Sequence, residues 1–196
     1  ALPGGVPAVL VNSLDGAGRA GFRIANAEGI ATVVAHLAAT GRRRLVHVGG
    51  PAGNIDARER CEGFLTAMAR HAPDIEPVVI EGDFREDSGA AAVAMLRARG
   101  VAFDGIVAAN DMMALGVLAA LREQGLSVPG DVAVTGFDDI PLARYLGLTT
   151  MRVPLAEMGA RAVARLIDAL QGGTLTPDTQ VVATDLVIRT TTEALT

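Results

Sequence analysis

Four polar or aromatic side chains in this sequence have the chemistry needed to recognise a small polyhydroxylated molecule. Asp138 can accept two hydrogen bonds from hydroxyl groups, and Asn110 can both donate and accept. Arg60 offers a planar fork of donors that suits vicinal hydroxyls or a carboxylate. Phe84 could cover the apolar face of a sugar or a base. These residue types favour binding over catalysis.

Each of these residues also has a structural explanation that involves no ligand. Asn110 could cap a helix, a role for which Asp111 is the alternative. Arg60 could be a solvated helix residue, and Phe84 could belong to the core. Their common position after predicted strands carries more weight than any one of them.

The segment from residue 103 to 139 places two of these side chains. Two short apolar runs flank a stretch with helical spacing that ends at Gly125, which is typical of a strand, helix, strand unit in a parallel sheet. Asn110 and Asp138 would then stand just past the carboxyl ends of two strands. In open α/β sheets, that edge is where ligands bind.

The same alternation of strands and helices extends over most of the chain. Predicted strands begin at Leu45, Val78, Ile106 and Val132, with a helical pattern between each pair. This order predicts a doubly wound α/β lobe with right-handed crossovers, complete from residue 27 to about 145.

Outside this lobe the sequence predicts few elements. Short strands are expected at residues 9–11 and 21–24, and one last strand at 180–189. Leu148 to Val153 reads as an extended link, and Pro154 begins an amphipathic helix with an apolar stripe opposite Arg161 and Arg165. These elements are too few to close a second lobe, which is expected to be small and irregular or incomplete.

Enzyme and metal chemistry find little support in the sequence. The three histidines have no ligand spacing, and the single cysteine, Cys61, falls on the apolar side of a predicted helix as a buried, inert thiol. Asp138 and Asp139 are neighbours in an extended segment and would point to opposite sides. No nucleophile elbow of the Gly-x-Ser-x-Gly type is present.

Composition argues against a nucleic-acid-binding surface and against a transmembrane helix. The 196 residues carry a net charge of −5, which argues against a nucleic-acid surface on this chain. Half of the residues are hydrophobic, yet no apolar run has the length of roughly 18 residues that a transmembrane helix needs.

Several motifs together resemble the effector-binding region of the lactose/galactose repressor family of bacterial transcription regulators. The similarity runs from about Val6 to Thr192. Its motifs are Gly49-Gly50-Pro51, Asp56-Ala57-Arg58-Glu59-Arg60, Glu81-Gly82-Asp83-Phe84, Asn110-Asp111-Met112-Met113-Ala114, Gly136-Phe137-Asp138-Asp139 and Leu148-Thr149-Thr150. The asparagine and glycine motifs are shared with periplasmic sugar-binding proteins, whereas the run 56–60 favours the repressors.

The resemblance implies a periplasmic-binding-protein-like fold of two lobes with the ligand in the cleft between them. Three crossovers would lie near Ala25, Met151 and Ala183. The expected parts are a partial N-terminal lobe, truncated at its N-terminus, at 1–25 and 150–183, and a complete C-terminal lobe at 26–149 and 184–196. The effector contacts implied are Asn12, Asp56, Arg60, Phe84, Asn110 and Asp138. This set adds Asn12 and Asp56 to the residues chosen above; many family members have aspartate in place of Asn12.

The function that the resemblance implies is sensing of a sugar or related polar metabolite in a cytoplasmic transcriptional regulator. It implies no cofactor, no metal and no membrane, and operator DNA would be bound only by the full-length protein. A homodimer is expected through the complete lobe, at segments 88–99 and 140–145. The alternative is a periplasmic sugar-binding protein of a transporter or chemoreceptor, which a signal peptide upstream would reveal.

Overall fold

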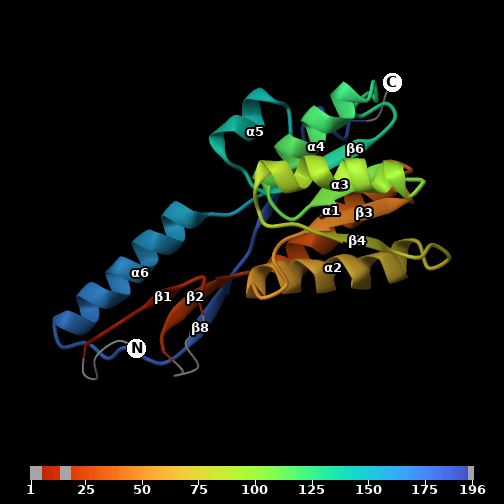
Figure 1. Ribbon diagram of the computed structural model, residues 1–196. Coiled ribbons are helices and arrows are strands. Elements are labelled where there is room, and N and C mark those ends of the chain that lie inside the picture. Colours follow the sequence, from red (N-terminus) through yellow and green to blue (C-terminus); the bar gives the residue numbers. More distant parts are fainter. Residues whose placement is uncertain (1–5, 14–18, 194–196) are drawn as a thin grey trace. The chain divides into compact units, whose positions relative to one another are not determined.

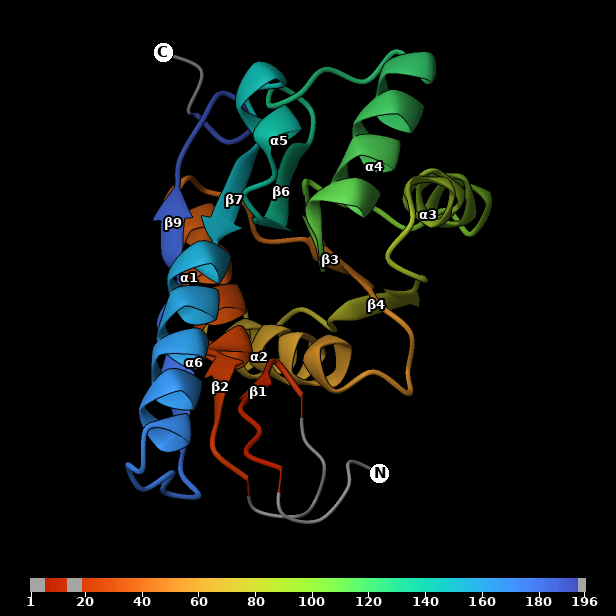
Figure 2. The same cartoon turned by 90° about the vertical axis from the view of Figure 1, so that its left-hand side faces the viewer.

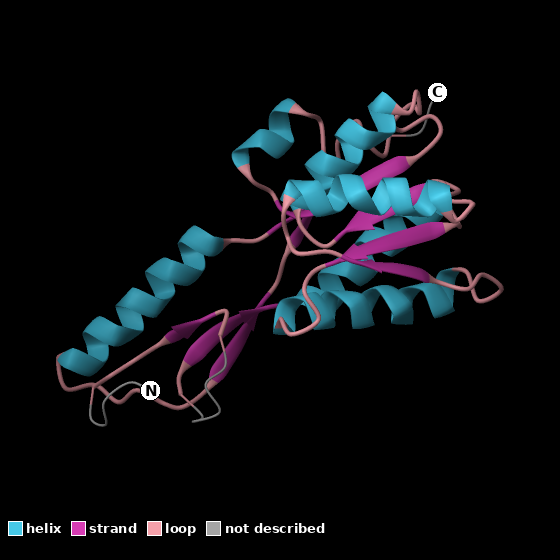
Figure 3. Cartoon of the chain, in the orientation of Figure 1, coloured by secondary structure: helices cyan, strands magenta, loops and turns pink. Residues whose placement is uncertain are grey.

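The computed structural model describes residues 6–13 and 19–193 (Figures 1 and 3). The chain divides into two compact units. Unit 1 is Ala1–Ala25 with Val153–Thr184, and unit 2 is Asn26–Arg152 with Asp185–Thr196. Among the described residues, no helix combines the length and apolar character that crossing a bilayer requires.

Unit 2 is built on a six-stranded sheet in the order β4-β3-β5-β6-β7-β9. The first five strands are parallel, and β9 runs antiparallel to β7. Their bounds are β3 (Leu45–Gly49), β4 (Val78–Glu81), β5 (Gly105–Ala108), β6 (Ala133–Asp138), β7 (Thr149–Arg152) and β9 (Asp185–Val187). Because β4 lies on one side of β3 and β5 on the other, the strand order reverses between β3 and β5. Such a switch point is where doubly wound sheets bind ligands.

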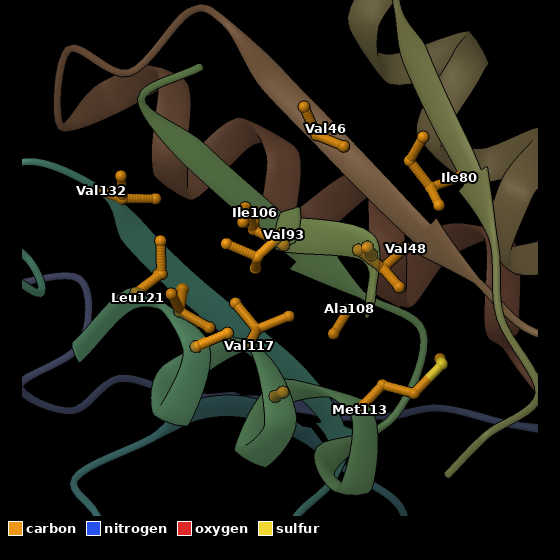
Figure 4. Close-up of a cluster of buried hydrophobic side chains, with 14 of the residues drawn as sticks. Val46, Val48, Ile80, Val93, Ile106, Ala108, Met113, Val117, Leu121 and Val132 are labelled. Atoms are coloured by element: carbon orange, nitrogen blue, oxygen red, sulfur yellow. The ribbon is translucent and has the colours of Figure 1, made fainter. Parts of the chain in front are cut away.

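Two pairs of helices cover this sheet, one pair on each face (Figures 1 and 2). On one face α1 (Asn26–Ala39) packs against α2 (Ile55–His71), and on the other α3 (Glu86–Ala98) packs against α4 (Asp111–Glu123). The short helix α5 (Pro141–Tyr145) follows β6. Figure 4 shows the core between the sheet and the second pair, where Val48, Ile106, Val117 and Leu121 are fully buried.

Two glycines allow α3 and α4 to approach closely. A Cβ atom on Gly116 of α4 would lie 1.9 Å from the backbone oxygen of Glu86, and one on Gly89 of α3 would lie 2.0 Å from the backbone oxygen of Met113. Both distances are far below van der Waals contact. The approach of the two helices therefore depends on the absence of side chains at these positions.

The structure resolves which residues cap the helices. Asn110 is the N-cap of α4, and its Oδ1 accepts a hydrogen bond from the Met113 backbone N–H at 2.9 Å. The alternative, in which Asp111 is the cap, is wrong, because the Asp111 carboxylate is fully buried and accepts hydrogen bonds from Ile140 and Thr150. Similarly, α2 is capped by Asn54, and Asp56 lies inside the first turn.

The described residues of unit 1 form three parallel strands, in the order β1-β2-β8, and one helix. The elements are β1 (Leu10–Val11), β2 (Gly21–Ile24), α6 (Leu155–Leu170) and β8 (Thr179–Val182). The single strand expected at 180–189 is wrong. Residues 179–182 pair with β2 in unit 1, and residues 185–187 pair with β7 in unit 2, so the segment contributes to two different sheets. The expected link at 148–153 forms β7.

Helix α6 does not bury the whole apolar stripe that its spacing predicts. Met158 and Ala162 are buried, but Val163 and Ile167 are each about half exposed. The guanidinium carbons of Arg161 and Arg165, expected on the polar face, lie 4.9 and 5.8 Å from the centre of the Phe22 ring. Cation–π attraction and the apolar stems of both arginines thus cover part of the small sheet.

Candidate ligand-binding site

Arg60 lies at the switch point of the unit 2 sheet with only 4% of its surface exposed. Its Nε donates to Asn26 Oδ1 at 2.8 Å, and Nη1 donates to the backbone oxygen of Ala109 at 2.5 Å. The guanidinium carbon lies 3.8 Å from the centre of the Phe137 ring. Two hydrogen bonds and one stacking contact hold the guanidinium in one orientation, so the solvated-residue explanation of Arg60 is wrong.

Asp138 faces Arg60 from the end of β6. Its Oδ1 lies 3.8 Å from Arg60 Nη2, which is longer than a hydrogen bond. Burial raises the pKa of Asp138 to about 6, against the opposing effect of Arg60. Asp138 is therefore a carboxylate that is ionised at neutral pH, partly desolvated and not directly bonded to its cationic neighbour.

Replacing Asp138 by asparagine is expected to stabilise unit 2 in a pH-dependent way. Because the pKa in the folded state is raised, the carboxyl group favours folding only while protonated, and this contribution is lost as the pH rises from about 4 through 6. Since the side chain is about one-third exposed, the gain in unfolding free energy for Asp138→Asn should be about 1–2 kcal/mol above pH 6 and should shrink toward pH 4.

Urea unfolding at several pH values measures this effect. Glu123→Gln, which removes an exposed carboxylate at the end of α4, is the matched control for the loss of one carboxylate. An equal gain for Asp138→Asn at every pH would contradict the assignment.

Asn26 links Arg60 to two acidic residues of α2. Its Nδ2 donates to Asp56 Oδ1 at 2.8 Å and to Glu59 Oε2 at 3.0 Å. The amide of Asn26 thus accepts from the cation and donates to both carboxylates. Sequence reasoning did not select Asn26 or Glu59. A signal for Asn26 is present in the sequence, because Asn26 is a polar residue two positions after the last residue of a strand, as Asn110 is.

Phe84 and Asn110 are in direct contact with each other. Asn110 Nδ2 donates to the backbone oxygen of Phe84 at 3.0 Å, while its Oδ1 caps α4. The Phe84 ring covers Gly50, where a Cβ atom would lie 2.3 Å from the ring. Asn110 is therefore a cap whose amide is already engaged, and Phe84 is a half-buried ring at the switch point.

Asp111 and Asp139 support the end of β6 from two sides. Asp111 accepts from Thr150 Oγ1 at 2.6 Å and from the Ile140 N–H at 2.8 Å, and burial raises its pKa to about 6. Asp139 forms ion pairs with Arg152 at 2.7 Å and Arg189 at 2.6 Å. These contacts fix the backbone that presents Asp138.

Unusual backbone conformations coincide with the predicted ligand residues. The non-glycine residues with positive φ in the described ranges are Asn12 (50°), Phe84 (69°), Asp138 (115°) and Asp139 (57°). Such conformations cost free energy and cluster at functional sites. Three of the four are predicted ligand contacts. Asn12 follows β1 in unit 1, whereas the other five predicted contacts belong to unit 2.

Cys61 is half-buried, not fully buried as the sequence predicts, and burial raises the pKa of its thiol. A thiol with a raised pKa is a poor nucleophile at neutral pH. Within residues 6–13 and 19–193, no group of three or more His, Cys, Asp or Glu side chains is placed to hold a metal ion.

Known proteins share both the sequence pattern and the fold. The family model for the periplasmic binding protein-like domain matches residues 34–192 of this chain. The HTH-type transcriptional regulator AscG of Escherichia coli is 37% identical over 147 residues, which are 74% of this chain and 44% of AscG. The chain spans about half the length of the curated relatives that it matches.

Two solved structures have the same fold. A sugar-binding transcriptional regulator of the LacI family from Escherichia coli, complexed with phosphate, has a TM-score of 0.83 and 31% identity, covering 94% of this chain and 68% of that one. The lac repressor dimer bound to operator and an anti-inducer has a TM-score of 0.87 and 30% identity. The match covers 97% of this chain and 58% of the repressor chain. The chain therefore belongs to the family of periplasmic binding protein-like domains, in the form found in LacI-type transcriptional regulators.

Proposed function

We propose that this chain is the small-molecule sensing part of a bacterial transcriptional regulator and that its effector is a sugar or a related polar metabolite. In the full-length protein, effector binding would control a DNA-binding head that lies outside this sequence, and such a regulator would act in the cytoplasm. The similarity to regulators, one of them named as sugar-binding, supports this proposal and does not favour the periplasmic alternative.

The observation that carries the proposal is the pairing of Arg60 with Asp138. Arg60 Nη2 and Asp138 Oδ1 are 3.8 Å apart, a distance too long for a direct hydrogen bond. A vicinal diol satisfies both groups, because one hydroxyl can accept from the guanidinium while its neighbour donates to the carboxylate. Phe84, beside the same strand ends, supplies an apolar surface for a sugar ring.

A thermal-shift screen of sugars, sugar acids and purines tests the proposed effector class. We expect a sugar with a vicinal diol to raise the melting temperature in proportion to the logarithm of its concentration. The matching deoxy sugar, which lacks one hydroxyl of the diol, is the control. Stabilisation by a purine and by no sugar would contradict the proposed class.

We further propose that the chain forms a homodimer through segments 88–99 and 140–145 of unit 2. Helix α5 supports this choice, since its residues Leu142 and Tyr145 are 45% and 74% exposed, and Leu146, which follows the helix, is 46% exposed. Apolar side chains this exposed and this close together mark an interaction surface. One of the related structures is itself described as a dimer.

Leu142→Lys is expected to shift the protein from dimer to monomer in light scattering at micromolar concentration, because a desolvated lysine in an apolar interface is unfavourable. Leu65→Lys on α2 is the control, since Leu65 is similarly exposed at 40% but lies on the opposite face of the sheet. A Leu142→Lys protein that remains dimeric would exclude this surface.

A further inference from the structure

Strand β4 forms an open edge of the unit 2 sheet, because β3 is its one neighbour in the described sheet (Figure 2). In a parallel ladder, alternate residues direct their backbone groups to the same neighbour. The Gly82 N–H donates to the Gly49 backbone oxygen at 2.8 Å, so Ile80, two positions earlier, faces β3 in the same way. The backbone N–H and C=O groups of Val79 and Glu81 therefore point away from the sheet, where an added strand can bond them.

A cavity of about 280 Å³ lies beside this edge, between β4 and helix α2. The side chains of Val79 and Glu81 line it from the strand, and Ala57 and Cys61 line it from the helix. Val79 is 38% exposed, so the cavity is open to solvent at the edge. None of the six predicted effector contacts lines this cavity, which is thus distinct from the candidate site.

The combination of edge and cavity selects the kind of molecule that fits. A strand edge beside a helix, with a pocket between them, is the arrangement in which PDZ domains bind extended peptides. The peptide backbone bonds the open edge, and alternate side chains fill the pocket. Val79, Ala57 and Cys61 give this pocket an apolar lining, which suits an aliphatic side chain.

The charge around β4 narrows the choice further. The segment 74–83 contains no lysine or arginine and four exposed acidic residues, which are Asp74, Glu76, Glu81 and Asp83. Arg43 offsets the charge of one of them through an ion pair with Asp74 at 2.5 Å. Two β4 strands side by side would bring like charges together, which is unfavourable. A segment with lysine or arginine side chains complements the remaining charge.

We propose that the edge of β4 and the cavity beside it bind an extended basic peptide segment of a partner protein by strand addition. The segment pairs with the outward backbone groups of Val79 and Glu81, places an aliphatic side chain in the cavity, and brings its cationic side chains near the acidic residues of segment 74–83.

Amide hydrogen exchange, followed by NMR of the ¹⁵N-labelled chain, tests the proposal with the peptide acetyl-Lys-Val-Lys-Val-Lys-amide as the probe. We expect the Val79 and Glu81 amides to shift and to exchange more slowly when the peptide is added. The Ile80 amide faces β3 and should exchange as before. Unchanged exchange at Val79 and Glu81 under saturating peptide would overturn the proposal.

The acidic peptide acetyl-Glu-Val-Glu-Val-Glu-amide is the matched control for charge. It has the same alternation and the same valines, and it should bind at least about tenfold more weakly. Equal binding of both peptides would contradict the proposed basic partner. Slow exchange at Val79 and Glu81 that appears without peptide, as the protein concentration rises, would assign the edge to a second copy of the chain and would also overturn the proposal.

Two variants locate the peptide on β4. Val79→Pro removes an N–H group that faces the open edge and leaves the bonds to β3 intact, so peptide affinity should fall at least about tenfold in a protein with unchanged circular dichroism. Glu81→Gln keeps an oxygen that can accept from the Ala52 N–H but loses the charge, and it should weaken binding by about two- to fivefold. Glu123→Gln on α4 is its control. Wild-type affinity in both β4 variants would exclude this edge.

Discussion

Replacing Arg60 by alanine is expected to weaken binding of the proposed sugar effector by about 10- to 100-fold. A hydrogen bond from a charged donor contributes roughly 1.5–3 kcal/mol, and the guanidinium is already oriented by Asn26 and Ala109 before a ligand arrives. The effector would lose this preorganised donor, and Asp138 would lose its cationic neighbour. Titration calorimetry with the sugar identified by thermal shift measures the change.

Two further variants make the Arg60 result specific. Arg58→Ala removes an exposed arginine two residues earlier on α2 and should leave the affinity unchanged. Arg60→Lys keeps the charge but loses the planar fork, so it should restore only part of the affinity. Wild-type affinity in a folded Arg60→Ala protein would remove Arg60 from the site.

Gly116→Ala is expected to lower the free energy of unfolding of unit 2 by about 3 kcal/mol. The added Cβ would lie 1.9 Å from the backbone oxygen of Glu86, and backbone atoms cannot move aside as the end of a flexible side chain can. The gain of roughly 1 kcal/mol that alanine normally brings to a helix interior is smaller than this clash. Helices α3 and α4 would have to separate, which would also open the core shown in Figure 4.

Denaturant unfolding of Gly53→Ala provides the comparison. A Cβ atom on Gly53, in the loop before α2, would have no neighbour within 4 Å, so this variant should be close to neutral. If Gly116→Ala were equally neutral, the close approach of α3 and α4 would not be essential to the fold.

Strands β3, β4, β5 and β6 of the unit 2 sheet could be predicted from the sequence because their signals are local. Each of these strands is a short apolar run, and each crossover has helical spacing, so the alternation that starts at Leu45, Val78, Ile106 and Val132 predicts parallel strands in a doubly wound sheet. Parallel strands share one carboxyl edge, and the position of Asp138 at that edge follows from this. The division of residues 179–187 between two sheets could not be predicted. It depends on pairing with distant strands, because 179–182 pairs with β2 and 185–187 pairs with β7.

The roles of individual polar residues were harder to predict than the strands, because these roles depend on partners that are distant in the sequence. Asn110 and Asp111 have equal capping chemistry, and the choice is decided by Thr150, which is 39 positions away and hydrogen-bonds Asp111. A charged residue on a helix normally predicts solvent exposure. Arg60 is buried because acceptors arrive from α1 and from the end of β5, which no local pattern reveals.

The positive φ angle of Asp138 has a consequence for laboratory evolution. Glycine adopts such an angle without steric cost, so Asp138→Gly would relax the backbone and would also remove a desolvated carboxylate. Selection for heat resistance alone would therefore enrich glycine at position 138, where the proposed sensor needs an acceptor. A library selected only for heat resistance would yield thermally stable proteins that no longer bind the proposed metabolite.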